Sequence, residues 1–127
     1  MAGLVIRNRA DVCAILIIDD EPGILKLMET ILSQNGYVVD TAENGEDGIQ
    51  KIEKNKYSLI FTDIKMPGIS GNHVLKYLRD KSPQKDTPII GMSGTPWLLD
   101  QDDFDAVLEK PYSLKETLDL VSQILKR

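Results

Sequence analysis

Five polar residues that can do chemistry stand directly after short apolar runs of the sequence. Three are carboxylates, Asp19, Asp20 and Asp63; the other two are Ser93 and Lys110. Carboxylates in excess over cations are costly to gather unless a further cation joins them. Carboxylate oxygens suit Mg²⁺, which also binds phosphate oxygens. With a metal in place, one carboxylate could attack phosphorus while Lys110 stabilises the phosphoryl oxygens, so these residues predict phosphoryl transfer.

Short apolar runs alternate with longer stretches of helical period from Ala14 onward. This alternation predicts βα units on a parallel sheet. Two runs are apolar at consecutive positions, as central strands covered on both faces should be, and these are 15–18 and 59–61. The five predicted strands are 14–18, 37–39, 59–62, 88–92 and 106–108.

Helical periodicity and capping residues predict the helices. The first begins near Pro22, which is tolerated in a first turn, and ends before Gly36. The last opens with Ser113 and Glu116 in a capping-box spacing and ends in two cations. The two between them are predicted at about 45–54 and 72–79.

The segment between the fourth and fifth strands is too short for a full helix. After two loops of about 2–6 residues each, only one or two helical turns remain between Ser93 and Val107. A fourth helix is therefore predicted to be shortened or missing. Trp97 stands in this segment, and two interpretations stay open for it: a plug over the bare sheet surface, or a partner contact.

The carboxyl ends of parallel strands lie at one edge of a sheet, where ligands of open α/β sheets bind. If the strand order is 2-1-3-4-5, all five polar residues converge on one crevice. A capping role for Asp19 and Asp20 at the first helix is the structural alternative.

Length, charge and cysteine content limit the class of protein. The chain has 127 residues, enough for one domain, and its net charge of −5 disfavours direct binding to nucleic acid. A single cysteine, Cys13, excludes an internal disulfide, and the apolar runs are too short to span a membrane. We therefore expect a cytoplasmic domain over residues 13–127, with residues 1–12 as a leader or an added extension.

Four short motifs, in order along the chain, resemble the receiver domains of two-component response regulators, including the chemotaxis regulators. They are Ile18-Asp19-Asp20-Glu21, the run from Asp63 through Met66-Pro67-Gly68 to Gly71, Met92-Ser93-Gly94, and Glu109-Lys110-Pro111. The resemblance covers residues 14–127. It implies a flavodoxin-like, doubly wound, five-stranded parallel sheet of order 2-1-3-4-5.

The resemblance assigns a role to each acidic residue. It implies that Asp63 accepts a phosphoryl group from a sensor histidine kinase or a histidine phosphotransfer protein. Asp20 and Asp63 would bind Mg²⁺ directly together with the backbone carbonyl of Lys65, and Asp19 would act through a water. Such a domain promotes its own phosphorylation and dephosphorylation without being an enzyme in the ordinary sense.

The resemblance also implies how phosphorylation changes the conformation that a partner recognises. Ser93 would bond a phosphoryl oxygen after transfer, Lys110 would pair with it, and a downstream protein would recognise the switched conformation. The domain would be a monomer or a weak dimer.

Two departures from the family pattern concern the output side. The family usually has a full helix after its fourth strand and often an aromatic residue three positions before the lysine, where this chain has Val107. We therefore expect the output to run through residues 94–105. The runner-up function is a receiver-like interaction module that is not phosphorylated.

Two enzyme or nucleotide-binding alternatives fit less well. Haloacid-dehalogenase phosphatases place an acid two residues after their aspartate, where this chain has Lys65, and no glycine-rich phosphate loop follows the first apolar run.

Overall fold

A computed structural model describes residues 14–94, 103–110 and 113–126. The strands are β1 (Ala14–Ile18), β2 (Val38–Ala42), β3 (Leu59–Asp63), β4 (Ile89–Ser93) and β5 (Ala106–Glu109), and the helices are α1 (Pro22–Gln34), α2 (Gly45–Lys54), α3 (Gly71–Lys81) and α4 (Leu114–Leu125). The predicted alternation of strands and helices is confirmed.

The five strands form one parallel sheet in the order β2-β1-β3-β4-β5. Every residue of β1, β3 and β4 is buried, which confirms that the consecutive apolar runs lie at the sheet centre. The predicted flavodoxin-like topology is confirmed. Because β1 and β3 are neighbours and β4 follows, the residues at their carboxyl ends share one edge.

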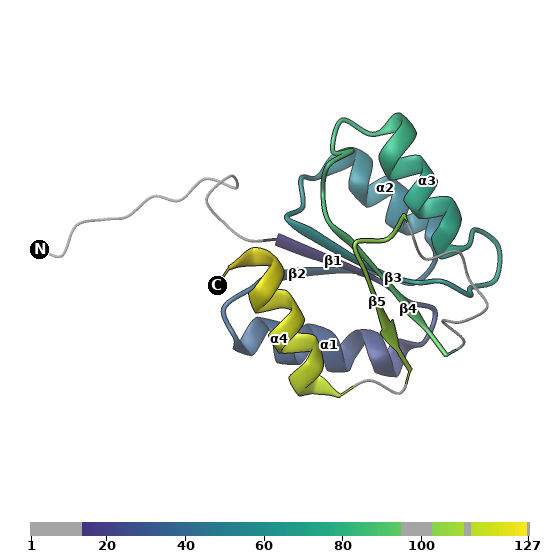
Figure 1. Cartoon of the computed structure of the whole chain (residues 1–127). Coiled ribbons are helices and arrows are strands. Elements are labelled where there is room, and N and C mark those ends of the chain that lie inside the picture. The colour runs from purple at the N-terminus through teal and green to yellow at the C-terminus, as the bar shows by residue number, and fades with distance from the viewer. Residues whose placement is uncertain (1–13, 95–102, 111–112, 127) are drawn as a thin grey trace, which may run out of the picture.

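Helices cover both faces of the sheet (Figure 1). α2 and α3 pack on one face, where Ile60, Val74 and Leu78 are fully buried, and α1 and α4 pack on the other, around Phe61 and Val121. The strands alternate their side chains between these two cores, as the pleat requires. None of the described helices is long and apolar enough to span a bilayer.

Local signals fix the helix ends as predicted. Pro22 opens α1, and Gly36 follows its end with φ of 89°, a left-handed conformation that glycine adopts without steric cost. The Tyr37 N–H donates to the Leu32 carbonyl to close that turn. At α4, Ser113 Oγ accepts the Glu116 N–H at 2.9 Å, so the predicted cap is present.

The second strand lies further along the chain than predicted. The sequence favoured residues 37–39, whereas β2 runs from Val38 to Ala42. β2 is an edge strand, and it includes the polar residues Asp40 and Thr41 because one side of it is only partly covered. Because these residues are polar, the apolar pattern of the sequence predicted only the first part of the strand.

The connection from β4 to β5 spans only residues 94–105, whereas α1 and α4 alone have 13 and 12 residues. Residues 95–102, and with them Trp97, lie outside the described residues; Gly94 and 103–105 belong to no helix. Phe104 is 6% exposed and joins the core on the α2–α3 face. It packs over Gly91 of β4, which leaves room for its ring. An aromatic side chain from the short connection thus fills part of the sheet surface.

Candidate functional site

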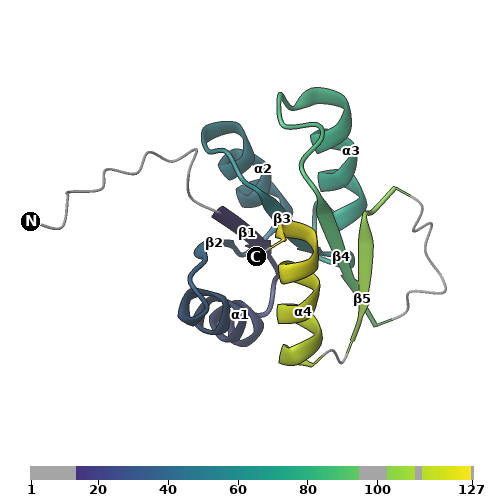
Figure 2. The same cartoon turned by 60° about the vertical axis from the view of Figure 1, so that its left-hand side comes forward.

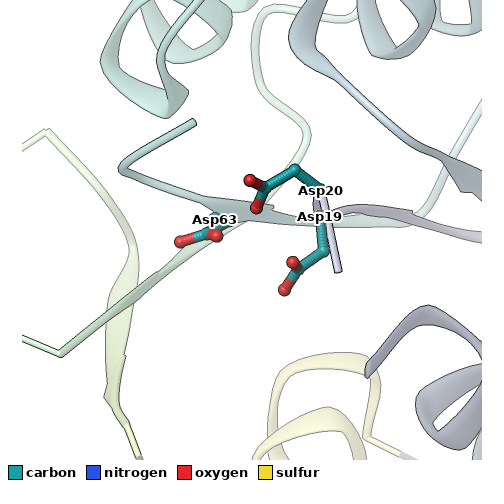
Figure 3. A group of neighbouring side chains, drawn as sticks. All are labelled: Asp19, Asp20 and Asp63. Atoms are coloured by element: carbon teal, nitrogen blue, oxygen red, sulfur yellow. The ribbon is translucent and has the colours of Figure 1, made fainter. Parts of the chain in front are cut away.

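The sheet register brings the predicted carboxylates together. Ile18 of β1 pairs with Thr62 of β3, so the residues that follow them, Asp19 and Asp63, come to the same edge. Figure 3 shows the side chains of Asp19, Asp20 and Asp63 gathered where β1 and β3 end. The convergence expected from the strand order is therefore found for these three residues.

The three carboxylates are close enough to share one cation. One oxygen from each of Asp19, Asp20 and Asp63 lies within 4.8 Å of the other two. Asp19 and Asp63 are buried, and Asp20 is exposed, so the cluster opens to solvent on one side. Asp19 Oδ2 is buried and makes no hydrogen bond with any described residue. A buried oxygen that no described residue hydrogen-bonds, beside two further carboxylates, fits a bound cation or a water held by one.

Lys110 supplies positive charge to this cluster. Its Nζ lies 3.3 Å from Asp63 Oδ2 and 3.8 Å from Asp19 Oδ2. It also lies 3.9 Å from Oε1 of Glu21, whose side chain is mostly exposed. Lys110 follows β5, and its own N–H donates to the Ser93 carbonyl at 2.7 Å, which holds the lysine backbone at the end of β4.

Burial dominates the ionisation of the two inner carboxylates. Desolvation raises the pKa of Asp63 to about 6, against the attraction of Lys110, which lowers it. Desolvation also raises the pKa of Asp19, and its hydrogen bond from the Glu21 N–H, then Lys110, opposes that rise. A cation at this edge would favour the charged form of both groups.

Asp19 does not serve as the cap of α1. The N-cap residue is Glu21, which makes no side-chain capping bond, and Asp19 Oδ1 instead accepts the Glu21 N–H at 2.9 Å. This bond turns the chain out of β1 and leaves Oδ2 facing Lys110. The capping alternative is therefore a poor account of Asp19.

Ser93 and Lys65 complete the set of predicted residues. Ser93 is 3% exposed and ends β4, beside the Asp63–Met92 pair in the register, so the sheet brings it to the same edge. Lys65 is exposed and lies in the loop after β3, two residues from Asp63. The roles predicted for Ser93 and the Lys65 carbonyl stay predictions.

A glycine holds that loop against the site. A Cβ on Gly71 would lie 2.4 Å from the Asp63 carbonyl oxygen and 2.8 Å from the Ile64 Cα, both backbone atoms. The Gly71 N–H also donates to the Ile64 carbonyl at 2.9 Å. The start of α3 therefore closes the loop that carries Lys65 tightly onto the end of β3.

Two ion-pair contacts, one at the site and one at the opposite end of β5, had no signal in the sequence. Glu21 was noted only as part of a motif, yet it contacts Lys110. Arg79 and Asp105 form an ion pair at 2.8 Å between α3 and the start of β5. An arginine and an aspartate far apart in the sequence carry no local pattern that would predict such a pair.

Comparisons with known proteins agree with this geometry. The family model for the response regulator receiver domain matches residues 15–122. The transcriptional regulatory protein ResD of Bacillus subtilis is 35% identical over 118 residues, which cover 89% of this chain and 48% of ResD. The response regulator ArlR of Staphylococcus aureus is 31% identical over 121 residues, which cover 89% of this chain and 52% of ArlR.

A solved structure is similar to the chain in both fold and sequence. It is the response regulator TrrA of Thermotoga maritima in complex with Mg²⁺ and beryllofluoride, 35% identical with a TM-score of 0.80, covering 89% of this chain and 99% of that one. This chain spans about half the length of the curated relatives described above.

Proposed function

The chain belongs to the response regulator receiver domain family, and from this premise we propose that Asp63 accepts a phosphoryl group from a histidine donor in a Mg²⁺-dependent reaction. The observation that carries the proposal is the approach of Lys110 to Asp63, at 3.3 Å, within a cluster of three carboxylates. The donor is a sensor histidine kinase or a histidine phosphotransfer protein. The phosphorylated domain then switches conformation and signals to a downstream protein.

Asp63 is the nucleophile of the proposed reaction. A carboxylate oxygen forms the new O–P bond while the P–N bond to the donor imidazole breaks, and the imidazole nitrogen takes up a proton. A pKa of about 6 leaves most of Asp63 ionised at pH 7, so it can attack.

The acidic residues hold the metal in this proposal. Asp20, Asp63 and the Lys65 carbonyl bind Mg²⁺ directly, and Asp19 acts through a water. Mg²⁺ supplies positive charge that neutralises the oxygens of the phosphoryl group during transfer. The all-oxygen donor set supports the metal, as does Asp19 Oδ2, a buried oxygen that no described residue hydrogen-bonds; a relative is known in complex with Mg²⁺.

Lys110 and Ser93 act on the product. Lys110 pairs with a phosphoryl oxygen, and Ser93 donates a hydrogen bond to another, which gives the phosphorylated state contacts that the free state lacks. Residues that stabilise the phosphoryl group during its transfer to Asp63 also stabilise it when water attacks its phosphorus. The domain therefore promotes both its phosphorylation and its dephosphorylation.

The proposed domain comprises residues 13–127, with residues 1–12 as a leader or an added extension, and acts as a monomer or weak dimer. A cytoplasmic location follows from the proposed donor, because a histidine kinase draws on ATP. The acidic net charge of −5 supports protein partners rather than direct contact with nucleic acid.

Mass spectrometry after incubation with acetyl phosphate tests the proposal. We expect the gain of one phosphoryl group that requires Mg²⁺ and is abolished by Asp63→Asn. Failure to gain the group, together with an absence of Mg²⁺ binding by calorimetry, would overturn it in favour of a phosphorylation-independent interaction module. A gain that persists in Asp63→Asn would overturn the assignment of Asp63.

A further inference from the structure

The strand that carries Lys110 stands at the edge of the sheet. β5 has four residues and pairs with β4 alone among the described strands (Figure 2). Its two central residues are Val107, half-buried, and Leu108, which is buried against the α1–α4 core. A short edge strand has few backbone bonds to fix its register, so the placement of Lys110 depends on what holds the two ends of β5.

Asp105 ties the start of β5 to the start of β4. Its N–H donates to the Ile89 carbonyl at 3.0 Å, and its Oδ2 accepts the Ile89 N–H at 2.8 Å. One residue therefore satisfies both backbone groups of Ile89 on this side. The Asp105 carboxylate therefore fixes the register of β5 against β4, with Asp105 opposite Ile89.

Arg79 connects the same carboxylate to α3 and to the turn before β4. Its Nη2 donates to Asp105 Oδ2 at 2.8 Å, and its Nη1 donates to the carbonyls of Lys85 at 2.6 Å and Thr87 at 2.8 Å. A guanidinium presents several donors in one rigid plane, which a lysine ammonium cannot reproduce. The Arg79 side chain is 28% exposed and the Asp105 side chain 45% exposed, so the geometry of the bonds rather than burial gives this network its value.

The register of β5 sets the distance between Lys110 and Asp63. Adjacent residues of a strand are about 3.3 Å apart along its axis, so a slip by one residue would move Lys110 by as much as its whole separation from Asp63. At the other end of β5, the Lys110 N–H donates to the Ser93 carbonyl.

We propose that Arg79 and Asp105 are positioning residues that hold β5 in register and so place Lys110 against the group on Asp63. This proposal rests on the proposed function, because the contact of Lys110 with the phosphoryl group is what they would control. They touch neither Asp63 nor its phosphoryl group, and they act from the opposite end of β5.

Mg²⁺ with beryllium and fluoride, the mixture found in a relative, is the probe for this proposal. We expect Asp105→Ala and Arg79→Ala to bind beryllofluoride about tenfold more weakly in saturating Mg²⁺, because a misplaced lysine loses a charge-assisted bond to the fluoride. Mg²⁺ affinity without beryllium, measured by calorimetry, should be unchanged, since its ligands follow β1 and β3. Asp105→Asn and Arg79→Lys should give smaller losses.

A double-mutant cycle tests whether the effect passes through the lysine. In the Lys110→Ala background, Asp105→Ala should cause no further loss of beryllofluoride binding. Asp80→Asn, an exposed acid next to Arg79, is the matched control and should bind both probes as the wild type does.

Several outcomes would overturn the proposal. They are equal loss of Mg²⁺ and beryllofluoride binding in the variants, wild-type binding of both, or additive losses with Lys110→Ala. If Asp105→Ala does not fold, Asp105→Asn and Arg79→Lys decide the matter by the same criteria. Failure of the wild type to bind beryllofluoride would instead count against the proposed function.

Discussion

The Lys110 ammonium lies 3.3 Å from the buried carboxylate of Asp63, yet the pKa of that carboxyl is still raised to about 6. Loss of hydration therefore outweighs the attraction of the lysine. The charges at this edge are held together by the fold at some cost, as is common where a binding site must be ready for a ligand.

The ionisation of Asp63 should make the metal-free protein less stable as pH rises. The carboxyl has a higher pKa folded than unfolded, so below about pH 4 it is protonated in both states and above about pH 6 it is charged in both. Only the folded state bears the cost of burying that charge. Relative to Asp63→Asn, the wild type should lose about 2–3 kcal/mol of unfolding free energy between those limits, since one pKa unit corresponds to about 1.4 kcal/mol.

Urea unfolding of both proteins in a chelator, from pH 4 to pH 7, measures this difference. Asp19 is present in both proteins, so the comparison reports the Asp63 charge together with its repulsion of Asp19. A difference between the two proteins that does not change with pH would contradict the prediction.

Removal of the lysine should raise the pKa of Asp63 further. Lys110→Ala deletes the opposite charge that lowers this pKa, so the carboxyl should titrate above 6 in the metal-free protein. Carbon-detected NMR of the Asp63 carboxyl follows it directly. Lys115→Ala is the control, because that lysine pairs with Asp119 on α4 instead. An unchanged pKa of Asp63 in Lys110→Ala would mean that the lysine charge does not affect the ionisation of this carboxyl.

Phe104 should be a major source of stability for the β4–β5 edge. Its ring is 6% exposed and meets the Ile64 side chain over Gly91, where both approach the position that a Cβ would take. Phe104→Ala should cost about 3–5 kcal/mol of unfolding free energy, the usual range for a buried phenylalanine. Leu27→Ala, at a side chain 45% exposed, should change stability by no more than about 0.5 kcal/mol. Equal losses in the two variants would show that Phe104 is not a core residue.

The sheet could be predicted from the sequence because its central strands are continuous apolar runs. All of Ile15 to Ile18 are fully buried, and the acids that follow are placed by topology alone once the strand order is known. β2 was predicted only in part because an edge strand mixes polar and apolar residues.

The contacts that hold the short β4–β5 connection could not be predicted from apolar runs and strand order. The sequence drew attention to Trp97, which lies outside the described residues, whereas Phe104 packs in the core. The pairing of Arg79 with Asp105 depends on α3 and β5 meeting across the fold. Such contacts follow from tertiary structure, and a single sequence shows no periodicity that reports them.

A side chain at position 71 should distort the loop beside Asp63. The Cβ of Gly71→Ala would meet two backbone atoms, the Asp63 oxygen and the Ile64 Cα, neither of which can rotate away. We expect a loss of about 1–3 kcal/mol in unfolding free energy, typical of overpacking. Gly23→Ala in α1 is the matched control, because nothing lies within 4 Å of its Cβ position. That variant should gain about 0.5–1 kcal/mol from helix propensity, and a comparable gain in Gly71→Ala would refute the contact.

Ser93 should affect the response to phosphorylation more than phosphorylation itself. It is buried at the end of β4, and its carbonyl holds the Lys110 N–H, a bond that Ser93→Ala retains. The variant should therefore still gain a phosphoryl group on Asp63 by intact mass. The phosphorylated variant lacks the hydrogen bond that the Ser93 hydroxyl would donate to the phosphoryl group. A hydrogen bond to a charged group contributes about 1.5–3 kcal/mol, roughly a tenfold to hundredfold shift in the switching equilibrium.

Amide NMR shifts in β4 and β5 on phosphorylation measure this effect, and in Ser93→Ala they should be much smaller than in the wild type. Ser58→Ala, at a half-buried serine before β3, is the control and should respond fully. A full response in phosphorylated Ser93→Ala would remove Ser93 from the switch and leave Lys110 as the residue through which the sheet edge detects the phosphoryl group.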